Sequence, residues 1–283
     1  MKKVLVLFIL LFMLLIPATA LAESTDTEAG TTPDSLFYWF DKMAERIFLL
    51  FTFDPQDKAE ALSKIGLERL AEAEESDNEE TIGKLISEFV KNNEKAEALA
   101  GDDLDTLVGL NEDQAEALDI LSELIDDEGI GDKGVDRAIS SVIKLLDKQS
   151  SKLEKLALSD SSKTAEKVAR VIDKTTAKLN KLLEKFSKDD EDDSDDNEKK
   201  TIEELIEHVQ SSTSKHIAVL ESLLDKVPDS ARASIEKAIE KSMHGSKTTS
   251  ETVGRRGPKA GSDGEASQAS SKGGGNGKSK DNE

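Results

Sequence analysis

Histidine and carboxylate side chains are the residues of this chain that could bind a metal or transfer a proton. The sequence contains three histidines, His208, His216 and His244, and no two of them have the four-residue spacing that binds zinc from one helical turn. Glu204 and His208 have that spacing and could supply two ligands. A metal centre in a helical bundle also needs a Glu and a His three residues apart, a pattern that this sequence lacks. We therefore expect neither a metal centre nor a cofactor.

The acidic runs and the nucleophilic residues give no better candidate for catalysis. Eight of the ten residues in 189–198 are acidic, but they lack the alternation of a calcium loop, and residues 126–137 place Ile130 and an arginine where such a loop needs ligands. No serine lies in a nucleophile elbow, and no glycine loop follows a strand pattern. The sequence predicts a non-enzymatic protein whose acidic surface binds divalent cations weakly at most.

Charge and cysteine content restrict the partners and the source of stability. The 283-residue chain has a formal net charge of −21, so we expect its body to bind neither nucleic acid nor anionic lipid. The acidic charge could serve to bind cations, to bind basic partners or simply to keep the protein soluble. Because the chain has no cysteine, disulfides contribute nothing, and the burial of aliphatic side chains in long helices must stabilise the fold.

The first 22 residues have the pattern of an export signal. Lys2 and Lys3 precede an uninterrupted apolar stretch at residues 4–16, and small residues follow up to Ala22. The stretch is shorter than the ~20 residues of a membrane-spanning helix. We expect cleavage near Ala22, a secreted or cell-envelope location, and a flexible lead-in at residues 23–32.

An aromatic segment at residues 36–51 has the periodicity of a one-faced helix. Its apolar residues recur every three or four positions, which predicts a buried face and a folding core formed by Phe37, Phe40, Ile47, Phe48 and Phe51. A helix lying on a membrane would show the same pattern. The polar face is balanced in charge rather than basic, so the sequence favours a core helix and disfavours contact with a membrane surface.

Further amphipathic segments follow up to residue 188, and no segment alternates with the period of a strand. Asp54 and Pro55 predict a helix start, because an aspartate side chain caps free amides and proline fits a first turn. Gly109 predicts the end of a short helix, and Asn111 with Gln114 predicts a capping box that opens the next one. The predicted fold of residues 33–188 is an all-α bundle or elongated helical array.

The carboxy-terminal part is predicted as a second helical unit. Residues 189–199 form an acidic linker, Thr201 caps a new helix, and a hairpin at 200–245 ends at Gly245 and packs on or beside the first part. Residues 246–283 are rich in glycine, serine and lysine and are predicted to be disordered. His216 lies on or beside the apolar stripe of the hairpin, where partial burial would make it pH-sensitive.

Two stretches resemble a family of secreted bacterial proteins known only as a domain of unknown function. Residues 33–75 contain LLFTFDP at 49–55 and LERLAEA at 67–73, and residues 204–245 contain His216, VLE at 219–221, LL at 223–224, KVP at 226–228 and IEKAIE at 235–240. The helical material between about Gly101 and Phe186 departs from the family pattern. The resemblance implies an exported helical module and assigns no activity.

Together these observations predict a non-enzymatic interaction or structural protein of the cell envelope, whose partner is another envelope protein or a second copy of itself. An extracytoplasmic stress sensor or chaperone-like binder is the first alternative. A low-affinity cation-binding acidic protein is the second.

Overall fold

The structure is a computed structural model that describes residues 38–128, 134–189 and 196–254. Regular structure in these residues is α-helical throughout and none of them forms a strand, so the predicted all-α fold is confirmed. The helices are α2 (Tyr38–Phe51), α3 (Pro55–Glu74), α4 (Glu79–Ala100), α5 (Leu104–Glu128), α6 (Val135–Ser159), α7 (Ser162–Asp189), α8 (Asp196–Leu223) and α9 (Asp229–Gly254). The predicted export signal, the lead-in and Phe37 lie outside the described residues, as do residues 255–283 of the predicted tail.

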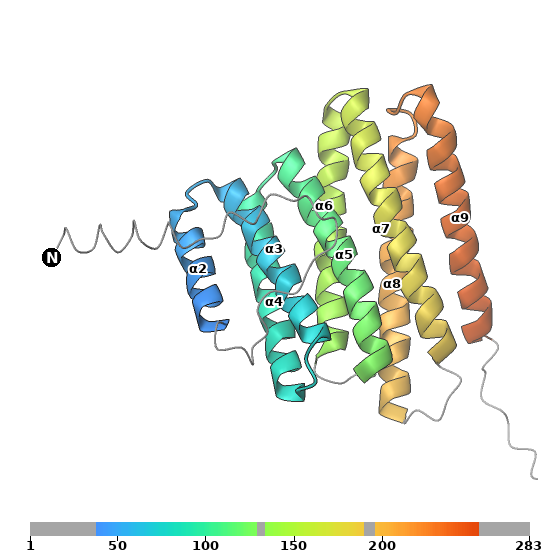
Figure 1. Cartoon of the computed structure of the whole chain (residues 1–283). Helices are drawn as coiled ribbons and strands as arrows, with labels where there is room; N and C mark the ends of the chain where they lie inside the picture. Colours follow the sequence, from blue (N-terminus) through green and yellow to red (C-terminus); the bar gives the residue numbers. More distant parts are fainter. Residues whose placement is uncertain (1–37, 129–133, 190–195, 255–283) are drawn as a thin grey trace, which may run out of the picture.

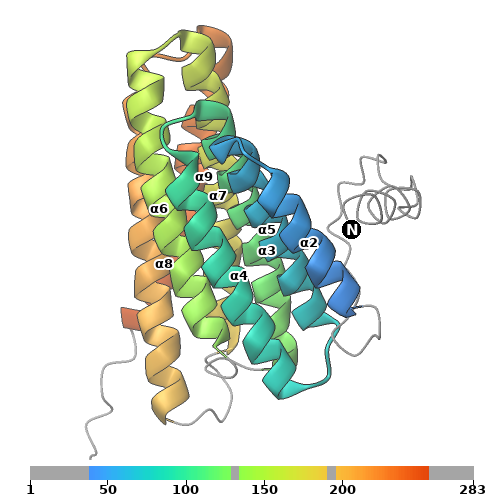
Figure 2. The same ribbon diagram turned by 90° about the vertical axis from the view of Figure 1, so that its left-hand side faces the viewer.

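The helices form an elongated array of two layers (Figures 1 and 2). Helices α3, α5, α7 and α9 contact one another in that order in one layer, and α4, α6 and α8 do so in the other. Consecutive helices from α3 to α9 also pack across the two layers. Helix α2 stands at one end of the array, against α3, and α9 stands at the opposite end. Each helix therefore contacts mainly its neighbours, as in stacked helical repeats.

The core consists of two hydrophobic clusters at different levels along the helix axes. One contains Phe89 of α4 and Phe186 of α7. The other contains Leu107 of α5 and Leu220 of α8. Each cluster includes residues from both sides of the acidic segment 189–199. Helix α8 thus shares a continuous core with the preceding helices.

A layer of buried polar side chains, here called the polar belt, separates the two clusters. It crosses helices α3 to α8 and consists of Ser63, Asn93, Asn111, Gln114, Gln149, Ser150, Thr175, Thr176, Ser212, Thr213 and His216. Gln114 Nε2 donates to Asn93 Oδ1 at 2.5 Å, and Thr175 Oγ1 donates to Asn111 Oδ1 at 2.7 Å. Asn111 Nδ2 donates in turn to Gln149 Oε1 at 3.3 Å. A buried polar group without a partner costs about 1–3 kcal/mol, so the belt opposes sliding of one helix past another.

Asn111 and Gln114 therefore serve the belt and do not cap a helix. Helix α5 runs without interruption from Leu104 to Glu128 and passes through Gly109, which corrects the prediction of two helices there. A glycine inside a helix costs only about 1 kcal/mol relative to alanine, so it need not end one. The partners of Asn111 come from α6 and α7, far along the sequence.

Two boundaries predicted near the carboxy terminus are also wrong. Helix α8 begins at Asp196, within the predicted acidic linker, so Thr201 lies inside the helix and does not cap it. Acidic residues are favourable in the first turn of a helix, which accounts for the earlier start. Helix α9 continues through Gly245 to Gly254, so residues 246–254, predicted as disordered tail, are helical.

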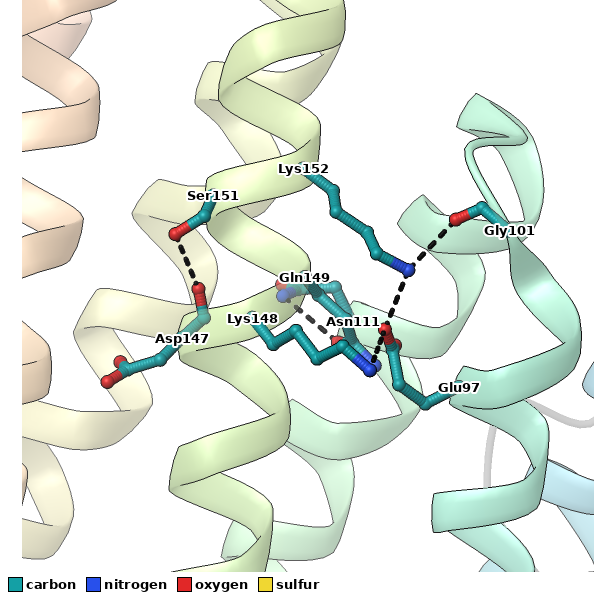
Figure 3. Close-up of polar contacts among 8 residues, drawn as sticks. All are labelled: Glu97, Gly101, Asn111, Asp147, Lys148, Gln149, Ser151 and Lys152. Carbon is teal, nitrogen blue, oxygen red and sulfur yellow. Dashed lines mark hydrogen bonds and ion pairs between the residues drawn. The ribbon is translucent and has the colours of Figure 1, made fainter.

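A buried carboxylate beside the belt links α4 to α6, its neighbour in the same layer (Figure 3). Glu97 of α4 is almost fully buried and accepts from Lys152 Nζ at 2.9 Å, while Lys148 Nζ lies 3.3 Å away. Lys152 also donates to the carbonyl oxygen of Gly101 at the end of α4, where the glycine has a φ of 60°. One lysine thus neutralises the carboxylate and satisfies a terminal carbonyl group of α4.

Close approach between α3 and α4 requires a glycine at position 66. A Cβ atom added to Gly66 would lie 2.7 Å from Asn93 Nδ2. Asn93 is held at this place because it accepts from Ser63 and Gln114 and donates to the Phe89 carbonyl oxygen. The absence of a side chain at Gly66 therefore makes room for the belt between these two helices.

Candidate functional site: the outer face of helix α2

The junction between α2 and α3 forms as predicted. Thr52 ends α2 because both its backbone N–H and its hydroxyl donate to the Phe48 carbonyl oxygen, at 3.0 and 2.9 Å. The Asp54 side chain then caps α3 by accepting from the backbone N–H groups of Gln56 and Asp57, at 2.9 and 3.2 Å. Pro55 occupies the first turn. This short connection folds α2 back against α3.

Helix α2 packs on the array through its charged face. Glu45 pairs with Arg69 of α3, and Lys42 pairs with Glu88 of α4. Arg69 is fully buried and also pairs with Glu72, which is equally buried. An unpaired charge left in such a place costs about 3–5 kcal/mol, so these ion pairs fix which side of α2 faces the array.

Tyr38 completes this contact, hereafter the ion-pair seam, formed by Tyr38, Lys42, Glu45, Arg69, Glu72 and Glu88. The Tyr38 ring centroid lies 5.4 Å from Lys42 Nζ and 5.7 Å from the Arg69 guanidinium carbon, within the range of cation–π attraction. Burial raises the pKa of Tyr38 to about 12, so its hydroxyl stays neutral. Burial also lowers the pKa of Lys42 and raises that of Glu72, because a low-dielectric surrounding disfavours both charged forms.

The aromatic face of α2 points outward, contrary to the prediction of a folding core. Phe40, Ile47, Phe48 and Phe51 are 50%, 42%, 59% and 67% exposed, and no residue of α2 is fully buried. Burying this face would require turning the helix, which would remove Glu45 from Arg69 and Lys42 from Glu88. The ion-pair seam therefore keeps the apolar side in solvent.

The exposed side is a broad apolar surface, here called the α2 face, formed by Trp39, Phe40, Ile47, Phe48, Leu50 and Phe51, with Phe53 just beyond the helix. At 100° per residue these positions of α2 cover about half of the helix circumference, opposite the ion-pair seam, without a charged residue among them. An aromatic side chain has a surface of ~200 Å². With the exposed fractions of these residues, including Phe53, the exposed apolar area is on the order of 800 Å². Monomeric proteins rarely expose more than a few hundred Å² in one apolar patch, so this surface points to binding.

A cleft of about 610 Å³ adjoins one edge of the α2 face, between α2 and α4. Its apolar wall includes Met43, Leu49, Leu62 and Ile65, and its polar lining includes Lys84, Lys91 and Lys95 of α4 together with Arg46. The three α4 lysines are exposed and form no ion pair with the described residues. Five of the lining residues are basic and two are acidic, in a chain that is strongly acidic as a whole.

The histidines lie apart from this surface. His216 is fully buried in the polar belt, where its Nε2 lies 2.8 Å from the Ser150 hydroxyl oxygen, and burial lowers its pKa to about 4. His208 is half-buried on the same helix. Within the described residues no group of three His, Asp or Glu side chains could hold a metal ion, and the side chain of His244 lies outside them.

Comparisons with known proteins agree with a module of unassigned activity. Residues 30–130 match the family model of a domain of unknown function (DUF5667). The match includes α2 and the ion-pair seam and continues through α5, so part of the helical material predicted to depart from the family pattern lies inside it. Residues 204–245, the second stretch of the predicted resemblance, lie outside it.

No curated protein matches the chain significantly. Among solved structures, a computationally designed self-assembling cyclic homo-oligomer aligns over 77% of each chain, with 15% identity and a TM-score of 0.49. This likeness supports no conclusion about assembly. None of the described helices is both long enough and apolar enough to cross a bilayer.

Proposed function

We propose that this protein is a non-enzymatic binding protein of the cell envelope and that α2 is its contact element. The observation that carries the proposal is the orientation of α2: buried ion pairs hold its charged side against α3 and α4, so its aromatic side is presented to solvent. Residues 1–22, with their export pattern, support an extracytoplasmic location.

The position of α2 in the array strengthens this proposal. The outer face of a terminal helix in a stacked array meets no further helix and is normally polar, which keeps the protein soluble. At this end the outer face is apolar instead, and the described residues offer nothing that covers it. A surface of this kind is most economically explained as a site for an external partner.

The experiment compares the α2 face with other exposed apolar residues of the same chain. The variant Phe48→Ser/Phe51→Ser removes two aromatic rings from the face. The control Leu158→Ser/Met243→Ser changes two apolar residues, 38% and 39% exposed, on α6 and α9. We expect the wild type and the control to fractionate with the cell envelope and the α2 variant to be released. Equal fractionation of all three proteins, with unchanged circular dichroism, would refute a contact role for α2.

A chaperone-like binder is the second candidate, because the same apolar face would also hold unfolded chains. It predicts that the wild type suppresses aggregation of a reduced, unfolding client protein and that Phe48→Ser/Phe51→Ser does not. Envelope fractionation without such suppression favours the contact role.

A further inference from the structure

We propose that the partner of the α2 face is an anionic lipid bilayer: α2 lies along the surface with its aromatic side chains in the acyl boundary, while Lys84, Lys91 and Lys95 contact the headgroups. This inference rests on the proposed contact role of α2 and names the surface that it contacts. The disposition of apolar and basic side chains around the end of the array supports it.

The breadth and composition of the α2 face suit a bilayer interface. A helix that pairs with one other helix needs a narrow apolar seam, whereas a helix lying in an interface embeds about half of its circumference. The α2 face covers about half of the helix and is rich in aromatic rings. Trp39 stands on the edge that lines the cleft, and tryptophan is enriched at the boundary between water and lipid.

The basic residues that an interfacial helix usually carries on its own polar side are supplied here by α4. The polar side of α2 is used for docking, since Lys42 and Glu45 are paired with α4 and α3. Lys84, Lys91 and Lys95 recur at intervals of seven and four residues, so they lie along one side of α4, beside the cleft. Their ammonium groups are exposed and complement anionic phosphate groups at the rim of the α2 face.

The acidic character of the chain is compatible with this contact because of where α2 stands. Electrostatic repulsion in physiological salt is screened over about 8 Å. The array extends away from α2 toward α9, so most of its carboxylates lie beyond that distance from a bilayer at the α2 end. The carboxylates of the seam, Glu45, Glu72 and Glu88, are all paired with basic groups.

The test uses Trp39, the sole tryptophan of the chain, as a reporter on the α2 face itself. The full-length protein is mixed with phosphatidylcholine vesicles, with or without about one-quarter phosphatidylglycerol. We expect a blue shift of Trp39 emission and co-sedimentation with the anionic vesicles, both weakened by added salt. The apolar stretch at residues 4–16 contains no tryptophan, so it produces no such signal directly.

Charge variants separate the lysine contacts from non-specific attraction. Lys84→Gln/Lys91→Gln/Lys95→Gln should reduce affinity for anionic vesicles at least about tenfold, since each lysine near an anionic surface contributes to attraction. The control is the equivalent triple change at Lys155 of α6, Lys163 of α7 and Lys226 in the turn between α8 and α9, all three exposed, and it should bind within about twofold of wild type. Equal losses in the two triple variants would overturn the assignment of the α4 lysines.

Three further outcomes would overturn the inference. Equal binding to vesicles with and without phosphatidylglycerol removes the headgroup contact. A blue shift without vesicles that grows with protein concentration identifies a second copy as the occupant. Failure to bind either vesicle, while Phe48→Ser/Phe51→Ser still releases the protein from the envelope, rejects the lipid and retains the contact role of α2. If the protein binds neither vesicle and Phe48→Ser/Phe51→Ser stays with the envelope, the proposed function is rejected as well.

Discussion

The interior helices of this array and its end helix α2 pack their amphipathic faces in opposite ways. In α6 and α8 the apolar stripe faces inward, and the buried polar residues of the belt are joined across helices. In α2 the charged face is turned inward and the apolar face outward. The comparison teaches that the partners of the buried polar groups, and not the apolar pattern alone, decide which side of a helix is covered.

Removing the charge at the centre of the ion-pair seam should have the largest effect. In Arg69→Met the buried carboxylates of Glu72 and Glu45 lose their partner, so we expect about 3–5 kcal/mol lower stability in urea denaturation. The control, Arg170→Met, removes an exposed pair with Glu166 and should change stability by about 0.5 kcal/mol or less. Comparable small losses in both variants would mean that the seam does not hold α2 in place.

His216 gives a matching test inside the array. Burial lowers its pKa from 6.5 to about 4, so the unfolded chain takes up a proton before the folded one as the pH falls. Above pH 6.5 the neutral His216 makes its full contribution to the free energy of unfolding. That contribution, about 3 kcal/mol, is lost as the pH falls from about 6.5 to 4. Asp147 and Lys215, the charged groups nearest to it, act in opposite directions.

Replacing His216 with Gln retains a side chain that can hydrogen-bond to Ser150 but does not titrate. The stability advantage of the wild type over His216→Gln should therefore shrink by about 3 kcal/mol as the pH is lowered from 6.5 to 4. Carboxylates that titrate in the same range, such as Asp113 with a pKa raised by burial to about 6, cancel in this difference. A constant difference across this pH range would show that His216 does not remain neutral in the folded protein.

Alanine substitutions at two glycines, one beside the polar belt and one in open space, test how closely the belt is packed. Gly66→Ala places a methyl group 2.7 Å from Asn93 Nδ2 and should destabilise the protein by about 1–3 kcal/mol. Gly109→Ala meets nothing within 4 Å and should stabilise α5 by about 0.5–1 kcal/mol, because alanine favours a helix. Thermal denaturation of the two variants should thus shift in opposite directions. Shifts of the same sign would indicate that Asn93 moves away from the added methyl group without a loss of folding stability.

The sequence alone was sufficient to predict the all-α fold and the α2–α3 junction but not the orientation of α2. The spacing of Phe40, Phe48 and their neighbours identifies an apolar face, yet periodicity does not say whether that face is covered. The signal that could have settled it is Arg69, which lies on the same stripe of α3 as Leu62 and Gly66. A charged residue at a buried position requires a partner, and Glu45 of α2 supplies one in addition to Glu72 of α3 itself.

The polar belt shows the same limit of local reasoning. Asn111 and Gln114 have the spacing of a capping box, and their side chains could form such hydrogen bonds locally. Their actual partners, Asn93, Gln149 and Thr175, are brought near by the packing of other helices. The Asp54 cap could be predicted because all of its partners lie within three residues.

That cap gives a small predicted effect and distinguishes the α2 junction from the rest of the array. Asp54→Ala and Asp103→Ala each remove a side chain that accepts from backbone N–H groups at a helix start, α3 in one case and α5 in the other. Each change should cost about 1 kcal/mol of stability. Only Asp54 lies at the junction that folds α2 back onto α3, so only its loss should alter the emission of Trp39 under native conditions. A similar emission change in Asp103→Ala would indicate that α2 responds to the stability of the whole array and not to its own junction.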